Sequence, residues 1–65
     1  MKYTYENKVF NLNVVDDGTL DTVIMVNGNE YRFDSDGRNT DGSIPETMFV
    51  DAIEAYLEDK AMGVI

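Results

Sequence analysis

Hydrophobic and polar residues alternate over residues 20–33, where two alternating segments flank the dipeptide Asn27-Gly28. Asn-Gly is the pair that best tolerates the positive φ angles of a type I′ hairpin turn. The pattern therefore predicts a β-hairpin in which Ile24 lies opposite Tyr31. The residues expected on its core face are Leu20, Ile24, Val26, Tyr31 and Phe33.

A second alternation runs from Phe10 to Val14 and is followed by Asp16-Asp17-Gly18. If these three residues form the loop to the next strand, Val14 lies opposite Leu20 and Phe10 lies opposite Ile24. Both alternations then direct their apolar residues to the same face of one sheet.

The N-terminal segment from Tyr3 to Tyr5 predicts a short edge strand. A turn at Glu6-Asn7-Lys8 would place Tyr3 opposite Phe10. With the segments already described, this gives a four-stranded antiparallel β-meander.

From Ser43 onwards apolar residues recur at spacings of three and four, as an amphipathic helix requires. Ser43 is expected to cap this helix, with Glu46 completing a capping box, Pro45 in the first turn and Gly63 as the C-cap. The apolar stripe consists of Phe49, Val50, Ile53, Tyr56 and Leu57. We expect an α+β fold, a single domain of residues 1–65, in which this one C-terminal amphipathic helix packs on one face of the meander.

The composition limits where the protein works and what it binds. The 65 residues contain no Cys, which fits a reducing compartment, and no apolar run long enough to span a bilayer. We therefore expect a cytoplasmic protein, in the host cytosol if phage-encoded, without a membrane partner. Thirteen acidic residues against five basic ones give a net charge of -8, so direct nucleic-acid binding is disfavoured and a basic protein partner is favoured.

The residue types also argue against catalysis. The chain has neither His nor Cys, so a Ser-His or Cys-His nucleophile cannot form. It also has no Gly-rich loop that would hold a phosphate group. We expect a protein that is not an enzyme and that uses no cofactor.

The oxygen-rich segment 34–46 invites comparison with a calcium-binding loop. If Asp41-Gly42 takes the fifth and sixth positions of an EF-hand loop, Gly37 takes the first and Met48 the twelfth, where acidic ligands are required. A start at Asp34 also places the wrong residue types at required positions. The segment is therefore interpreted as a connection that ends in a helix cap, and no metal site is expected.

Acidic residues are concentrated in residues 34–59, which hold eight of them against Arg38 alone. Within the helix, Asp51, Glu54 and Glu58 form a ridge opposite the apolar stripe, where like-charge repulsion costs a few tenths of a kcal/mol per pair. An ordinary solvated helix face is one interpretation; the repulsion favours the other, a surface kept for a partner. The predicted partner-binding residues are Glu30, Asp34, Asp36, Asp41, Asp51, Glu54 and Glu58.

A different class of function follows from the second face of the sheet. The expected register puts Val9 opposite Met25 and close to Val23, so that a small apolar patch is left uncovered. The alternative hypothesis is a structural or accessory module that forms a homodimer through this face or through an edge strand.

The stretch "VIMVNGNEYRF", followed by an acidic turn and "FVDAIEAYLED", resembles the strand–turn–strand–acidic loop–helix half of small phage anti-CRISPR proteins. The resemblance covers about residues 20–60, and the helical N-terminal portion of that family is absent from this chain. Those proteins inhibit an RNA-guided nuclease by mimicking DNA. The resemblance implies a phage or mobile-element inhibitor in which Glu30, Asp34, Asp36 and the helix acids occupy the nuclease's basic duplex-binding site.

Overall fold

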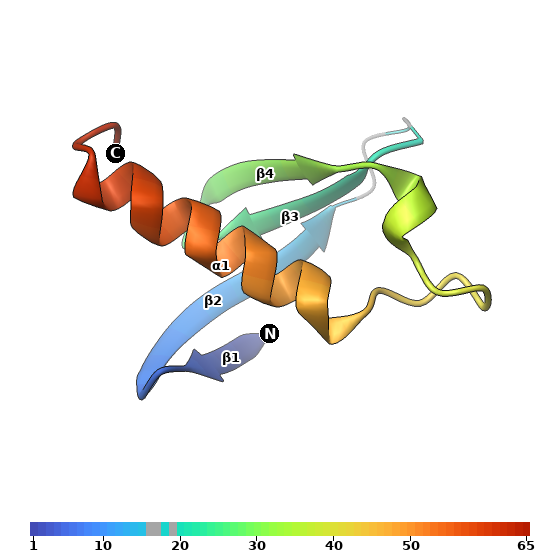
Figure 1. Ribbon diagram of the computed structural model, residues 1–65, viewed down its shortest axis with the longest axis horizontal. Coiled ribbons are helices and arrows are strands. Elements are labelled where there is room, and N and C mark those ends of the chain that lie inside the picture. Colours follow the sequence, from blue (N-terminus) through green and yellow to red (C-terminus); the bar gives the residue numbers. More distant parts are fainter. Residues whose placement is uncertain (16–17, 19) are drawn as a thin grey trace.

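A computed structural model of the protein describes residues 1–15, 18 and 20–65. Its elements are β1 (Lys2–Tyr5), β2 (Lys8–Val15), β3 (Thr22–Val26), β4 (Asn29–Phe33), the 3₁₀ helix η1 (Ser35–Gly37) and α1 (Glu46–Ala61). The strands form one antiparallel sheet in the order β1-β2-β3-β4, and α1 crosses one face of it (Figure 1). The predicted α+β fold is confirmed.

The β3–β4 hairpin has the predicted register, with Ile24 paired to Tyr31. Asn27 and Gly28 form its turn with φ angles of 49° and 86°. Two consecutive positive φ angles are the signature of the type I′ turn that Asn-Gly favours.

The β1–β2 hairpin pairs Tyr3 with Phe10, as predicted. Its turn is shorter than expected, because Glu6 and Asn7 alone adopt positive φ angles, of 50° and 64°, and Lys8 already belongs to β2. The two-residue turn matches the right-handed twist of the strands that it joins.

The predicted register between β2 and β3 is wrong. Val14 pairs with Ile24 instead of Leu20, and Leu12 pairs with Val26. β2 ends at Val15 and β3 begins at Thr22, so the connection is longer than three residues; the predicted loop residues Asp16 and Asp17 lie outside the described part of the chain. The difference of four residues keeps the same side chains on the core face, since strand side chains alternate with a period of two. Leu20, expected in the core, lies before β3 and is 88% exposed.

The two halves of β2 pair with different neighbouring strands. Its first half, up to Asn11, pairs with β1, and its second half, from Leu12, pairs with β3. The Met1 carbonyl accepts a hydrogen bond from the Leu12 amide at 2.8 Å, and the Asn11 amide donates to the Asn27 side chain at 2.9 Å. The long β2 strand thus joins two staggered hairpins into one curved sheet (Figure 1).

The helix starts later than predicted. Its first residue is Glu46, and Pro45 occupies the N-cap position without a side-chain capping bond, so the capping box headed by Ser43 does not form. A cap at Ser43 would require Ile44 to be helical, but the residue before a proline is driven into an extended conformation. The helix therefore begins only after Pro45, at Glu46.

The C-terminal end of α1 confirms the expected glycine cap. Gly63 has φ 78°, its amide donates to the Lys60 carbonyl at 3.2 Å, and the Val64 amide donates to the Asp59 carbonyl at 3.0 Å. This pair of bonds is a Schellman motif, which satisfies carbonyls left free at the helix end.

The core lies between α1 and the facing side of the sheet. Of the predicted helix stripe, Ile53 and Tyr56 are buried, whereas Phe49, Val50 and Leu57 are half-buried. Phe10 packs edge-to-face against Tyr56, with ring centroids 6.1 Å apart. The buried cluster consists of Phe10, Leu12, Ile24, Val26, Met48, Ala52, Ile53 and Tyr56.

Tyrosines on the two edge strands form hydrogen bonds to α1 near its two ends. The Tyr3 hydroxyl of β1 donates to Glu46, the first residue of the helix, at 2.6 Å. The Tyr31 hydroxyl of β4 donates to Asp59, near the last turn, at 3.0 Å. The helix is therefore held to both edges of the sheet, and its outer face has a fixed orientation.

Candidate functional site

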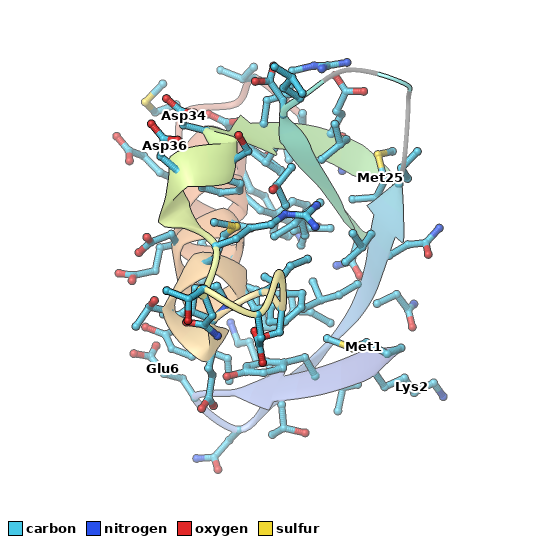
Figure 2. All side chains as sticks on the ribbon, turned by 90° about the vertical axis from the view of Figure 1, so that its right-hand side faces the viewer. Met1, Lys2, Glu6, Met25, Asp34 and Asp36 are labelled. Carbon is cyan, nitrogen blue, oxygen red and sulfur yellow. The ribbon has the colours of Figure 1, made fainter. Side chains whose placement is uncertain are left out.

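Five of the predicted partner-binding acids share the helix side of the molecule. Asp34 and Asp36 lie at η1, on the same side of the sheet as α1, whereas Met25 lies on the opposite side (Figure 2). On α1 the ridge acids are exposed, and the buried residues lie on the other side of the helix. The group, called the acidic face below, consists of Asp34, Asp36, Asp51, Glu54 and Glu58.

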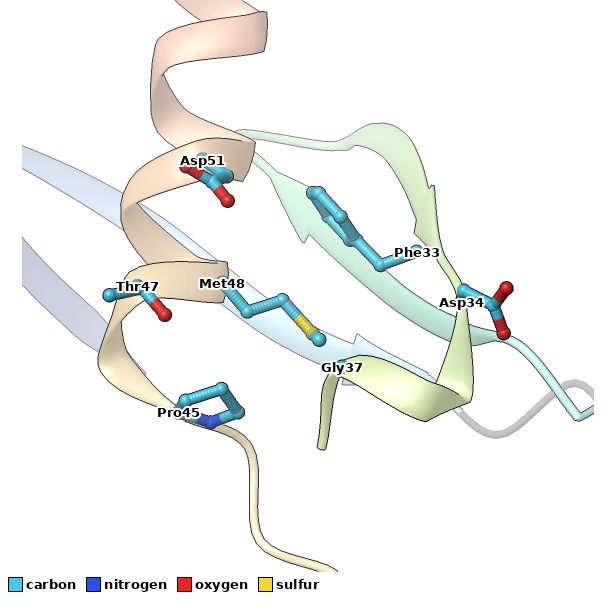
Figure 3. Close-up of a pocket in the computed structure, with 7 residues that line it drawn as sticks. All are labelled: Phe33, Asp34, Gly37, Pro45, Thr47, Met48 and Asp51. Atoms are coloured by element: carbon cyan, nitrogen blue, oxygen red, sulfur yellow. The ribbon is translucent and has the colours of Figure 1, made fainter. Parts of the chain in front are cut away.

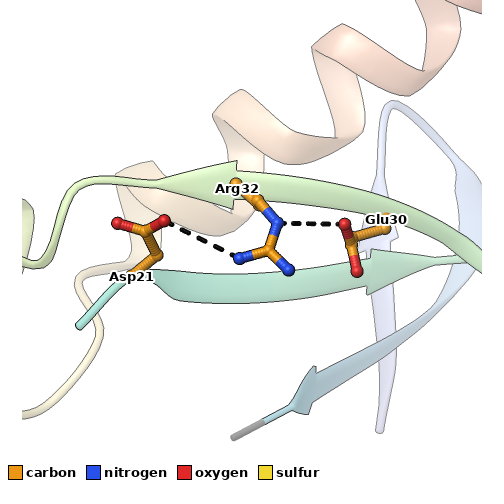
Figure 4. A network of polar contacts seen from close by, with 3 residues as sticks. All are labelled: Asp21, Glu30 and Arg32. Atoms are coloured by element: carbon orange, nitrogen blue, oxygen red, sulfur yellow. Dashed lines mark hydrogen bonds and ion pairs between the residues drawn. The ribbon is translucent and has the colours of Figure 1, made fainter. Parts of the chain in front are cut away.

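The basic residues near this region are engaged elsewhere. Arg32 lies between Glu30 and Asp21, with contacts of 3.0 and 3.7 Å (Figure 4). The Lys60 ammonium group lies 6.0 Å from the centre of the Tyr56 ring. In the described part of the chain, no ion pair joins a basic side chain to the acidic face.

Arg38, the only base of the acidic segment, is directed towards the sheet. Its Nε donates to the Thr22 hydroxyl at 2.7 Å, and its Nη1 donates to the Gly42 carbonyl at 3.4 Å. Thr22 is fully buried, so Arg38 provides a partner for a hydroxyl that water cannot reach. This link anchors the segment after η1 to β3.

Two predicted site residues are used locally. Asp41 Oδ1 accepts hydrogen bonds from the Ser43 hydroxyl at 2.6 Å and the Ser43 amide at 2.9 Å. The hydroxyl bond is the main cause that lowers the pKa of Asp41 below its ordinary value. Glu30 pairs with Met25 across the hairpin and binds Arg32, so it belongs to the opposite face of the sheet. Neither residue joins the acidic face.

An open hollow of about 290 Å³ lies between η1 and the start of α1. The Phe33 ring and the Met48 side chain point into the space between β4 and α1 (Figure 3). Asp34 stands on the η1 side and Asp51 on the helix side. The lining residues are Phe33, Asp34, Gly37, Pro45, Thr47, Met48 and Asp51.

Gly37 allows the two walls of this hollow to approach each other. A Cβ atom on Gly37 would lie 2.9 Å from the Met48 methyl carbon, closer than real side chains approach. Phe33 was predicted to lie in the core, and neither Met48 nor Gly37 was predicted to take part in binding. The contact between Gly37 and Met48 depends on the path of η1. Neither the alternation of the strands nor the spacings of three and four in the helix predict this path.

The apolar patch predicted on the other face does not assemble. Val9 pairs with Thr4 of β1, and Met25 pairs with Asn13 of β2, so the expected Val9–Met25 pairing is wrong. The cause is the same register error as in the β2–β3 pairing. Val23 is 1% exposed, whereas Val9 is 61% exposed. These positions therefore do not form the continuous apolar patch that the first form of the dimer hypothesis requires, and association through an edge strand stays a prediction.

Tyrosine hydroxyls beside the helix act as hydrogen-bond donors. Burial and the bond to Asp59 raise the pKa of Tyr31 to about 12. The hydrogen bond to Glu46, with a smaller effect of burial, raises the pKa of Tyr3. Both groups stay protonated at neutral pH and stabilise the position of α1.

Within residues 1–15, 18 and 20–65, no three carboxylates are grouped so that they could hold a metal ion. No helix in the same residues is long and apolar enough to cross a membrane. No protein-family model, curated protein or solved structure matches this chain. We therefore infer function from the acidic face and the hollow themselves.

Proposed function

We propose that this protein is a non-enzymatic inhibitor that binds a basic, nucleic-acid-handling partner by DNA mimicry. The carboxylates of the acidic face take the positions that phosphates would occupy on the partner. The observation that carries the proposal is that five exposed acids share one side and have no basic ion-pair partner in the described residues. A surface of one sign steers a partner of the opposite sign and raises its association rate.

The spacing and rigidity of the helix acids support this proposal. Residues three and four apart on a helix are separated by about 4.5 and 6 Å along its axis, the same order as the roughly 3.4 Å between charges along one DNA strand. Because Tyr3 and Tyr31 hold both ends of α1, the helix that carries these carboxylates is already in place before binding. Less conformational entropy is then lost when the partner binds.

The resemblance to phage anti-CRISPR proteins narrows the choice of partner. It makes an RNA-guided nuclease the first candidate and implies a phage or mobile-element protein that acts in the cytosol of the host. In this proposal the protein does not contact nucleic acid and competes with it for the partner's basic site.

The experiment replaces the ridge with neutral residues in the triple variant Asp51→Asn, Glu54→Gln and Glu58→Gln. We expect an intact and equally or slightly more stable fold, because like-charge repulsion is removed. Affinity for the basic partner should fall, mainly through a slower association rate and a weaker salt dependence. Isothermal titration calorimetry, with duplex DNA as a competitor, measures both effects.

A matched control variant removes the same number of negative charges elsewhere: Glu6→Gln, Asp21→Asn and Glu30→Gln. If net charge alone drives binding, the two triple variants lose affinity equally, and the assignment to the acidic face fails. Unchanged affinity in the ridge variant without competition by DNA would reject mimicry. Association that persists at high salt would instead indicate an apolar interface.

A further inference from the structure

We propose that the hollow between η1 and α1 is a subsite for one arginine side chain of the partner. This inference rests on the proposed function, since it assumes that the partner's surface is basic. It adds a specific anchor to an otherwise distributed electrostatic contact. Binding energy at protein interfaces is commonly concentrated in a few such residues, and Arg is among the types most often found there.

The interior of the hollow fits the aliphatic part of an arginine. Phe33, Pro45 and Met48 supply apolar surface, and the Phe33 ring points towards the helix across the gap (Figure 3). Long cationic side chains pack their methylene groups on apolar surface while the charged end stays near water. A guanidinium group can also stack on an aromatic ring, which attracts cations through its electron-rich face.

The rim of the hollow fits the charge of an arginine. Asp51, from the second turn of α1, directs its carboxylate towards the hollow, whereas the Asp34 carboxylate is turned away from it and accepts a hydrogen bond from the Asp36 amide (Figure 3). Among the described residues that line the hollow, none is basic. A planar guanidinium offers five N–H donors and can bind the Asp51 carboxylate through two of them, whereas an ammonium group is a compact and more strongly hydrated charge.

The size of the hollow also agrees with a single side chain. Its volume of about 290 Å³ lies just below the roughly 300–1,000 Å³ found for small-molecule sites. The hollow is open rather than enclosed, so a side chain that projects from another protein surface can enter it without any movement of α1.

The first test uses the peptide Ac-Gly-Arg-Gly-NH₂ and the protein labelled with ¹³C at its methionine methyl groups. Titration should shift the Met48 methyl signal in NMR spectra, because Met48 lines the hollow. The Met25 methyl group, on the opposite face of the sheet, should not shift and serves as an internal control. The peptides Ac-Gly-Lys-Gly-NH₂ and Ac-Gly-Gln-Gly-NH₂ should give a weaker response and none, respectively.

Variants separate a defined subsite from general attraction between charges. Asp51→Asn should weaken binding of the arginine peptide by about two- to fivefold, the range that corresponds to an exposed ion pair. Glu6→Gln removes an equal charge at the β1–β2 turn, away from the hollow, and should leave peptide binding unchanged. Gly37→Ala adds a methyl group against Met48 and should weaken binding without changing any charge.

The proposal is overturned if the Met48 signal does not move, if the lysine peptide binds as well as the arginine peptide, or if Glu6→Gln weakens binding as much as Asp51→Asn. If Gly37→Ala does not fold, the comparison of Asp51→Asn with Glu6→Gln still decides the matter. Loss of partner affinity in the ridge variant, without any peptide response at Met48, would reject the subsite and keep the proposed function. If the arginine peptide shifts the Met48 signal but duplex DNA does not compete for any partner, the subsite is kept and the proposed function is rejected.

Discussion

Arg38 shows how a single residue can leave a surface strongly charged. It is the one base in a segment with eight acids, and its guanidinium group could have neutralised one of them. It binds the buried Thr22 hydroxyl and the Gly42 carbonyl instead. A buried polar group without a partner costs about 1–3 kcal/mol, so this use of Arg38 contributes to stability. The acidic face keeps its full charge as a result.

Tyr31 makes the stability of the protein sensitive to alkaline pH. The hydroxyl has a pKa of about 12 in the folded protein and about 10 when exposed, so the folded state holds its proton more tightly. This contribution is fully present below pH 10 and is lost as the pH rises towards 12. We expect roughly 1–2 kcal/mol of unfolding free energy to be lost over this interval, since partial solvation of the hydroxyl reduces the effect. Urea unfolding at a series of pH values measures it.

The variant Tyr31→Phe is the control for this titration. It lacks both the ionisable group and the bond to Asp59, so it should be less stable at pH 7 by roughly 0.5–1.5 kcal/mol. Its stability should also fall less steeply between pH 10 and 12 than that of the unmodified protein. Parallel pH profiles of the two proteins would contradict the role assigned to Tyr31.

At the scale of elements, short turns were predicted correctly from their own residues, whereas the strand pairing across a longer connection was not. Asn27-Gly28 fixed a hairpin and its register because the turn conformation is decided by those two residues. The β2–β3 register was wrong because it was inferred from an assumed loop length, and a longer connection moved the pairing by four residues. The helix was predicted to start too early because the prediction relied on the capping pattern of Ser43 and Glu46. In the structure Pro45 keeps Ile44 extended, and the helix begins at Glu46.

The candidate site divides in the same way. Helical periodicity was sufficient to place Asp51, Glu54 and Glu58 on one exposed face. The hollow beside them arises where Gly37 passes close to Met48, residues that are eleven positions apart in different elements. Such a contact depends on the three-dimensional path of the connection, which residue spacing does not encode.

The packing of α1 on the sheet gives an element-scale prediction. Ile53 is fully buried in the core cluster, so Ile53→Ala should lower the unfolding free energy by about 2–5 kcal/mol. Val50→Ala, at a half-buried position of the same helix, is the matched control and should cost less. Chemical denaturation of both variants tests this order, and equal costs would show that α1 covers the sheet differently.

The molecule as a whole carries a net charge of -8, and the acidic face concentrates part of it on one side. Ionic strength of about 0.15 M screens exposed charges beyond roughly 8 Å, which weakens repulsion among the acids more than it weakens the few ion pairs. We expect the melting temperature to rise when sodium chloride is increased from a few millimolar to this value. Differential scanning calorimetry should show a smaller rise for the ridge variant, and an equal rise would assign the repulsion to other acids.

The order of the elements along the chain has a consequence for synthesis on the ribosome. Each strand pairs with its neighbour in sequence, so the two hairpins can form as they emerge. The cover of the sheet comes last, because α1 begins only at Glu46. Until then Leu12, Ile24 and their neighbours present a bare apolar surface that chaperones or other nascent chains can bind. The apolar surface is covered only when α1 packs on the sheet, so the helix that carries the acids also ends this exposed stage of synthesis.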